Sequence, residues 1–269
     1  MMKRYARFSN VAVKLALAHP AKTSGWLEED FAVWSAACEP VPALDGEVCL
    51  WLVRLDCRAE SIERLSRLLS DDERRRVARF HFRRDAARFV VGRAALRTIL
   101  GEVLRVEPRT IRLTYGPYGK PELGEPFDRA GLRFNLSHSD SVGLCAVTRR
   151  RRVGVDIERL RPVPEWEAIA DRMFSPQECH ALRRLPAAQR REAFFSGWTR
   201  REAYAKALGE GFSARLEDLE RDPPGPPRWS LEALVPEPGY VAAVAVEGQI
   251  SRLVRRTWPP ATDVDERHA

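Results

Sequence analysis

Apolar and polar residues follow one another along the chain in patterns that predict both strands and helices. The unbroken apolar run within 47–55 predicts a buried strand, and the alternation over 110–115 predicts a second one. A turn at 116–121, with two glycines and two prolines, follows this second strand. Further strands are expected at 143–148, 153–158, 239–246 and 250–257.

Helices are indicated by a different spacing. Apolar residues recur at every third or fourth position within 84–100, which predicts an amphipathic helix. Capping boxes, in which a serine and a glutamate three residues later cap the first turn, begin two more helices at Ser70–Glu73 and Ser175–Glu178. A long helix is expected over 187–208.

Both halves of the chain place helices before strands, which favours a mixed α+β fold over alternating βαβ units. We therefore expect two comparable subdomains, over 47–150 and 151–258. Residues 1–46 are expected to form an N-terminal extension, and residues 259–269 a charged tail.

The composition excludes membrane-spanning, collagen-like, disordered and disulfide-scaffold proteins. Of the 269 residues 44% are hydrophobic and 31% are charged, and no apolar run approaches the roughly 18 residues of a membrane span. The five cysteines are odd in number and never spaced as CxxC, which indicates reduced thiols in a cytoplasmic protein.

The formal net charge of +7 favours anionic partners, among them nucleic acid, anionic lipid, phosphorylated small molecules and acidic proteins. Only five of the 45 basic residues are lysines, and after residue 22 only Lys120 and Lys206 remain. This distribution is explained either by chance or by a need for a compact ammonium group at these two positions. Four consecutive arginines at 149–152 predict a solvated turn or, alternatively, a contact with an acidic protein.

Two carboxylates of the predicted strand 153–158 are candidates for a metal site. Alternate residues of a strand point to the same face, so Asp156 and Glu158 project together while Val155 and Ile157 pack behind them. Paired carboxylate oxygens suit Mg²⁺, but two ordinary surface acids would follow the same pattern.

The long predicted helix carries a third carboxylate. Trp198, Glu202 and Lys206 are four residues apart and share one face, so a carboxylate lies one turn from an ammonium group. One interpretation is a surface ion pair that supports the helix. The other is that Glu202 completes a metal site with Asp156 and Glu158, while Lys206 contacts a phosphate oxygen.

The segment FNLSHS at 134–139 is expected to be a loop that offers backbone N–H groups and His138 to a phosphate. A single histidine in a loop is more often structural, and Lys120 in its turn is an equally weak signal. No nucleophile elbow or Ser/His/Asp order indicates a hydrolase.

Taken together, FNLSHS (134–139), VGVDIE (153–158) and WTRREAYAKALGEGF (198–212) resemble the 4′-phosphopantetheinyl transferases. The length and twofold layout are similar to the Sfp (surfactin-synthetase-activating) type, and the resemblance covers about 47–250. It implies an α+β fold built as a pseudo-dimer of two similar α/β subdomains. Coenzyme A and the active site are then expected in the cleft between them.

The resemblance also implies roles for individual residues. Asp156, Glu158 and Glu202 match the family's metal-binding acids, which hold Mg²⁺ against the pyrophosphate of coenzyme A. Lys206 matches the lysine that contacts this pyrophosphate, which makes Glu202 and Lys206 the expected catalytic pair.

Further positions match the family's coenzyme A-binding residues. Ser137 and His138 match a phosphate-binding pair, and Lys120 matches a lysine near the nucleotide. Arg76 falls where the family uses a basic residue for coenzyme A. Four neighbouring arginines compete for this last role: Arg74, Arg75, Arg79 and Arg88.

We therefore expect transfer of the 4′-phosphopantetheine arm of coenzyme A to a serine of an apo acyl or peptidyl carrier protein, with release of adenosine 3′,5′-bisphosphate. Mg²⁺ would neutralise the pyrophosphate while the serine attacks the β-phosphorus. As a hypothesis, Glu202 takes the serine proton, directly or through a metal-bound water. The expected protein is a cytoplasmic monomer whose basic charge suits an acidic carrier, with no nucleic-acid or membrane partner.

One position departs from the family pattern, because Arg201 stands where a lysine usually precedes the metal-binding glutamate. This difference favours, as an alternative, a member that binds coenzyme A without transferring its arm. A basic nucleic-acid-binding module is a second alternative. It predicts aromatic residues interleaved with basic ones on an exposed sheet, which the sequence lacks, and it leaves Asp156 and Glu158 unexplained.

Overall fold

The computed structural model describes residues 35–36, 44, 46–209 and 228–258. The predicted N-terminal extension, with a few exceptions, and the predicted tail lie outside the described residues. The described chain is a mixed α/β protein with six helices, and none of them combines the length and apolar character needed to cross a lipid bilayer.

Two sheets form the centre of the molecule. The larger has the strand order β1-β10-β2-β6-β5, and the smaller has the order β7-β9-β8. The strands of the larger sheet are Ser35–Ala36, Arg252–Trp258, Glu47–Arg54, Val142–Arg149 and Leu132–Ser139, in that order. Those of the smaller sheet are Val153–Arg159, Tyr240–Glu247 and Trp229–Leu234.

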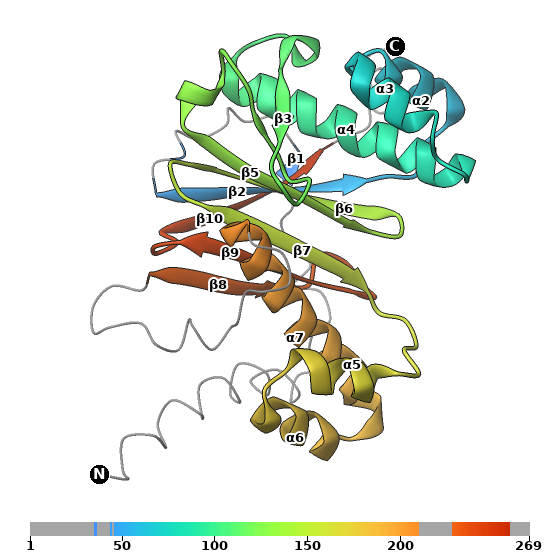
Figure 1. Ribbon diagram of the computed structural model, residues 1–269, viewed down its shortest axis with the longest axis vertical. Helices are drawn as coiled ribbons and strands as arrows, with labels where there is room; N and C mark the ends of the chain where they lie inside the picture. Colours follow the sequence, from blue (N-terminus) through green and yellow to red (C-terminus); the bar gives the residue numbers. More distant parts are fainter. Residues whose placement is uncertain (1–34, 37–43, 45, 210–227, 259–269) are drawn as a thin grey trace.

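The sheets pack face to face between two long helices, so the molecule has four layers (Figure 1). Helix α4 (Arg83–Leu104) covers the outer face of the larger sheet, and α7 (Ala187–Leu208) covers the outer face of the smaller one. The alternation of β2 explains this arrangement. Trp51 faces α4, whereas its neighbours Leu50 and Leu52 face the strands of the other sheet.

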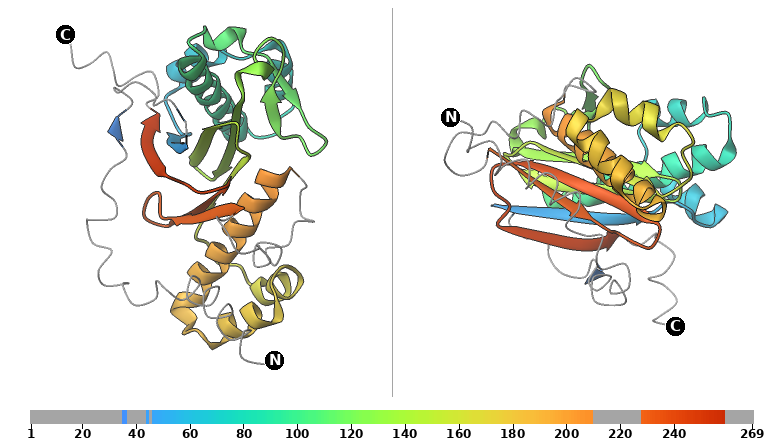
Figure 2. Two further views of the ribbon diagram at one scale, coloured as in Figure 1. Left: turned by 90° about the vertical axis from the view of Figure 1, so that its left-hand side faces the viewer. Right: turned by 90° about the horizontal axis from the view of Figure 1, so that it is seen from below.

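Shorter elements complete each half. Helices α2 (Ala59–Ser66) and α3 (Asp71–Val77) precede α4, and α5 (Trp166–Met173) and α6 (Pro176–Arg184) precede α7. A hairpin of β3 (Leu113–Tyr115) and β4 (Pro121–Leu123) projects from the α4 half toward α7 (Figure 2, left). Two 3₁₀ turns occupy Pro108–Thr110 and Asp128–Ala130.

The helix predictions are confirmed. Helix α7 has the predicted bounds, both capping boxes are present, and the predicted helix 84–100 continues one turn further to Leu104. The predicted strand at 110–115 is only partly correct, because Pro108 begins a 3₁₀ turn that delays the strand to Leu113.

Strand β10 does not follow the predicted division at 150/151. Although it belongs to the predicted subdomain 151–258, it pairs in parallel with β2 in the larger sheet. Its last residue, Trp258, is buried in the core beneath α4. Burial of this large apolar side chain stabilises the pairing of β10 with the N-terminal half.

Candidate active site

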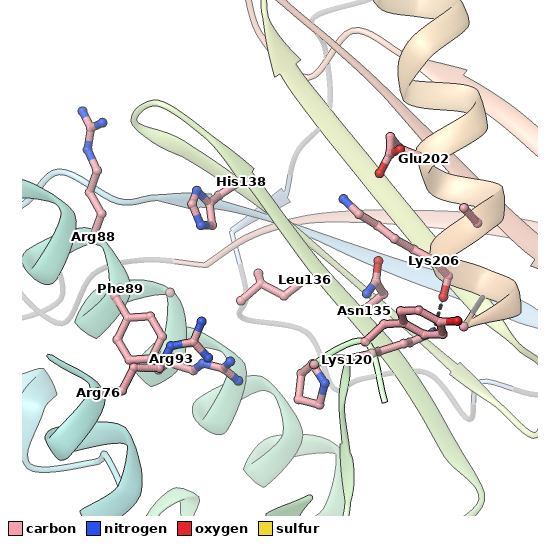
Figure 3. Close-up of a pocket in the computed structure, with 16 residues that line it drawn as sticks. Arg76, Arg88, Phe89, Arg93, Lys120, Asn135, Leu136, His138, Glu202 and Lys206 are labelled. Atoms are coloured by element: carbon pink, nitrogen blue, oxygen red, sulfur yellow. Dashed lines mark hydrogen bonds between the residues drawn. The ribbon is translucent and has the colours of Figure 1, made fainter. Parts of the chain in front are cut away.

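A pocket of about 470 Å³ lies where the two halves meet (Figure 3). Helices α3 and α4 contribute one wall, and the C-terminal part of α7 contributes the opposite wall. Strand β5 and the turn of the β3–β4 hairpin lie between them. The chemically important lining residues are Arg76, Arg88, Phe89, Arg93, Lys120, Asn135, His138, Glu202 and Lys206.

Strands β5 and β7 lie at the edges of their sheets and are joined through the polar side chains of β5. Asn135 Oδ1 accepts a hydrogen bond from the backbone N–H of Val155 at 2.8 Å. The same two-residue period then places two hydroxyl groups opposite the two carboxylates of β7. Ser137 Oγ donates to Asp156 Oδ1 at 2.9 Å, and Ser139 Oγ donates to Glu158 Oε2 at 2.8 Å.

The expected loop at 134–139 is therefore wrong, because these residues belong to β5. Strand β5 lies at the edge of its sheet, and its polar side chains form hydrogen bonds with strand β7 of the other sheet. Its polar sequence therefore does not indicate a loop. Ser137 is buried and engaged with β7, whereas the side chain of His138 lies in the pocket wall (Figure 3). Partial burial, together with Lys206 and Arg88, lowers the pKa of His138.

Helix α7 contacts β7 without an intervening side chain at Gly154. A Cβ atom at this position would lie 2.0 Å from the carbonyl oxygen of Ala203 and 2.3 Å from the amide nitrogen of Ala207. Only glycine permits such a close approach of two backbones. The approach brings Lys206 to the face of β7 that carries Asp156.

Lys206 and Asp156 form the central ion pair of the site. The Nζ atom of Lys206 lies 2.5 Å from Asp156 Oδ1 and 3.0 Å from Ser137 Oγ. The other oxygen of Asp156, Oδ2, is buried and has no hydrogen-bond partner in the described part of the chain. The ion pair thus leaves one oxygen of a buried carboxylate without a hydrogen bond.

The three predicted metal ligands share one electrostatic environment. Burial raises the pKa values of Asp156, Glu158 and Glu202, and the negative charge of Asp156 raises the other two further. Lys206 opposes this effect at all three carboxylates. Carboxylate oxygens whose ionised form is disfavoured by burial fit a hard divalent cation.

The structure does not bring these three carboxylates to a common centre. Over the residues that the structure describes, no three histidine, cysteine or acidic side chains gather closely enough to hold a metal ion. Lys206 and Ser137, rather than another carboxylate, contact Asp156.

Lys120 is directed at backbone carbonyl groups. Its Nζ donates to the carbonyl oxygen of Val153 at 3.0 Å. It also donates to that of Lys206 at 2.6 Å (Figure 3). These bonds fasten the β3–β4 hairpin to β7 and to the last turn of α7, whose carbonyl groups lack helical partners. Burial lowers the pKa of Lys120 to about 8.

Aromatic and arginine side chains line the opposite wall. The guanidinium groups of Arg76 and Arg93 lie 5.0 Å and 5.3 Å from the ring centre of Phe89. Of the arginines that compete with Arg76, only Arg88 also lines this pocket, and it forms ion pairs with Asp56 and Asp140.

Sequence reasoning missed Arg93, which is only 8% exposed. Its Nη1 atom is buried without a hydrogen-bond partner among the described residues, and burial lowers its pKa. The available signal was an arginine beside Ala94 and Ala95 on the buried part of the predicted helix. A charged side chain at such a position requires a partner or a ligand.

Arg201 points away from the pocket into the packing of α6 and α7. Its guanidinium group contacts a carboxylate oxygen of Glu178, donates to the carbonyl oxygen of Gly197 and lies 4.3 Å from the ring centre of Phe174. Glu178 also completes the capping box with Ser175. The arginine therefore connects the start of α6 to α7.

Comparisons with known proteins agree across both halves. Residues 152–245 match the model of the 4′-phosphopantetheinyl transferase superfamily, and residues 56–149 match that of the 4′-phosphopantetheinyl transferase N-terminal domain. The chain is 46% identical over 213 residues to the 4′-phosphopantetheinyl transferase HetI of Nostoc sp., which spans 76% of this chain and 90% of HetI.

More distant relatives carry related names. The 4′-phosphopantetheinyl transferase Sfp of Bacillus subtilis is 29% identical over 60% of this chain and 69% of its own. The human L-aminoadipate-semialdehyde dehydrogenase-phosphopantetheinyl transferase is 29% identical over 58% of this chain and 53% of its own. With both halves matched and a close relative covered almost throughout, the chain belongs to the 4′-phosphopantetheinyl transferase superfamily.

Proposed function

We propose that the pocket between the two halves binds coenzyme A and that the protein transfers its 4′-phosphopantetheine arm to a serine of an apo acyl or peptidyl carrier protein. The observation that carries this proposal is the juxtaposition of Lys206 and Glu202 on one wall of the pocket with Arg76 and Arg93 on the other. Cations at both ends suit a ligand that carries phosphate groups at separate places.

We propose Asp156, Glu158 and Glu202 as the residues that would hold Mg²⁺, although the three carboxylates do not share a common centre in the described structure. The buried, unpartnered Oδ2 of Asp156 supports this assignment, as do the raised pKa values of the three carboxylates. The bound ion would offset negative charge on the pyrophosphate. Lys206 then binds a phosphate oxygen. Glu202 receives the proton of the carrier serine as that serine attacks the β-phosphorus, and the bond from this phosphorus to the bridging oxygen breaks to release adenosine 3′,5′-bisphosphate.

We infer that the protein acts as a pseudo-dimeric monomer, because one chain supplies both walls of the pocket. The alternative of an inactive coenzyme A-binding member rested on Arg201. Its contacts with Glu178 and Phe174 give this residue a role in helix packing, so that alternative loses its only support.

The proposal is tested by intact-protein mass spectrometry of a panel of apo carrier proteins incubated with the protein, coenzyme A and Mg²⁺. The expected result is the addition of one phosphopantetheine group, which EDTA prevents and excess Mg²⁺ restores. An unmodified panel, alongside a working transferase as positive control, would contradict transfer. Transfer that persists in EDTA would contradict the metal assignment alone.

A further inference from the structure

An exposed aromatic residue stands at the corner between α3 and α4. Phe82 is 62% exposed, and its position immediately before α4 makes it the N-cap residue. Its side chain accepts no capping hydrogen bond, and hydroxyl or amide side chains are strongly preferred at this position. Among the described residues, Phe82 is one of three exposed large hydrophobic side chains. Tyr118 lines the pocket and Tyr115 faces Arg93. Phe82 instead makes an edge-on contact with the ring of His81, which is itself exposed.

The surroundings of Phe82 are strongly basic. We call Phe82 and four exposed arginines near it in the sequence, Arg75, Arg79, Arg83 and Arg84, the Phe82 patch. No acidic residue occurs between positions 74 and 84, and Asp85 lies 3.8 Å from Arg84. An aromatic anchor within a rim of arginines is typical of an interface for an acidic protein surface.

The first turns of α4 connect the patch to the pocket. Six residues of helix, or about 9 Å, separate Phe82 from Arg88 in the pocket wall. Arg88 is paired with Asp140, and the neighbouring Ser139 donates to Glu158. Figure 1 shows the start of α4, the β5–β6 turn and the end of β7 on one side of the molecule.

We propose that the Phe82 patch docks the apo carrier protein through an acidic surface of that protein, and so delivers its serine to the pocket. This inference rests on the proposed transfer function and adds to it the surface that recognises the protein substrate. Phe82 supplies the apolar anchor, and the arginines supply charge complementarity that accelerates and orients the encounter.

The test compares Phe82→Ser and the double variant Arg79→Glu/Arg83→Glu with the wild type in steady-state transfer. Each is expected to raise KM for the carrier about tenfold or more, while the dissociation constant of coenzyme A stays within twofold. Phe82→Trp, which keeps an aromatic anchor, should retain the wild-type KM. The double variant should also show a weaker decline of kcat/KM with rising salt.

Arg109→Glu provides a matched control. This exposed arginine lies beyond the opposite end of α4, and its reversal should leave KM for the carrier unchanged. Unchanged carrier KM in both patch variants, with transfer intact, would overturn the docking proposal while leaving the transfer function standing. Absence of transfer by the wild type would instead overturn the transfer function. Loss of binding to anionic vesicles or DNA, with an unaltered carrier KM, would assign the patch to another partner.

Discussion

The ammonium group of Lys206 and the carboxylate of Asp156 lie 2.5 Å apart, although α7 and β7 place these residues 50 positions apart in the chain. Each would have a different partner in the loaded enzyme, a phosphate oxygen for the lysine and a cation for the carboxylate. Their pairing fixes Lys206 at the pocket wall and lowers the cost of burying Asp156.

Replacement of Lys206 should affect binding and stability together. Lys206→Met should weaken coenzyme A binding about 10- to 100-fold, measured by calorimetry with Mg²⁺, because a charged hydrogen bond to phosphate is lost. It should also lower the free energy of unfolding by about 2 kcal/mol, because Asp156 stays buried without its cation. Arg191→Met, at an exposed position of the same helix, should change neither quantity. Coenzyme A affinity equal to the wild type would remove Lys206 from the binding site.

Replacement of Glu202 should affect turnover more than binding. If Glu202 takes the serine proton, Glu202→Gln should lower kcat about 10²- to 10⁴-fold under saturating Mg²⁺, since the amide cannot accept that proton. KM for coenzyme A should change much less at this metal concentration. Near-normal turnover of the variant would exclude the proposed base.

Gly154 should tolerate no side chain. Gly154→Ala places its Cβ against the backbone of Ala203 and Ala207, so α7 must move away from β7. We expect a loss of about 3 kcal/mol in chemical denaturation, together with loss of coenzyme A binding as Lys206 leaves Asp156. Gly143→Ala, whose new Cβ meets neighbours at ordinary distances of 3.5 Å or more, is the control. Equal stabilities of the two variants would show that the contact is not tight.

Arg201 should contribute to stability and not to coenzyme A binding. Arg201→Met should lower the free energy of unfolding by about 2 kcal/mol, because the carboxylate of Glu178 is only partly exposed and loses its cation. The dissociation constant of coenzyme A should stay within twofold. A large loss of affinity with unaltered stability would restore a direct role for this position.

Lys120 should make stability depend on pH in the alkaline range. Its pKa is about 8 in the folded protein and 10.5 for an unperturbed lysine, so the unfolded chain binds more protons between these values. The free energy of unfolding therefore rises with pH in this window. Relative to Lys120→Met, the wild type should gain about 1–2 kcal/mol between pH 8 and pH 10.

Lys120→Arg is the control for this titration, because its guanidinium group stays charged throughout the window. Its stability relative to Lys120→Met should not rise between the two pH values. Parallel curves for the wild type and Lys120→Met would show that the ammonium group is not desolvated.

Much of the local structure, and the identity of the candidate residues, follows from the sequence alone. The capping box at Ser175–Glu178, the bounds of α7 and the shared face of Asp156 and Glu158 depend on residues within a few positions of one another. Such patterns are read directly along the chain because local backbone geometry fixes which side chains meet.

Other features were decided only by tertiary packing. The polar sequence of β5 suggests a loop, because the partners of its side chains, Val155, Asp156 and Glu158, lie on another sheet. The targets of Lys120 are carbonyl groups 33 and 86 positions away, and Arg201 finds Glu178 on another helix. Trp258 packs in the core beneath α4, and β10 therefore pairs with β2 of the larger sheet. The sequence therefore determined which groups could act, whereas contacts between distant segments decided which ones face the pocket and which ones hold the fold together.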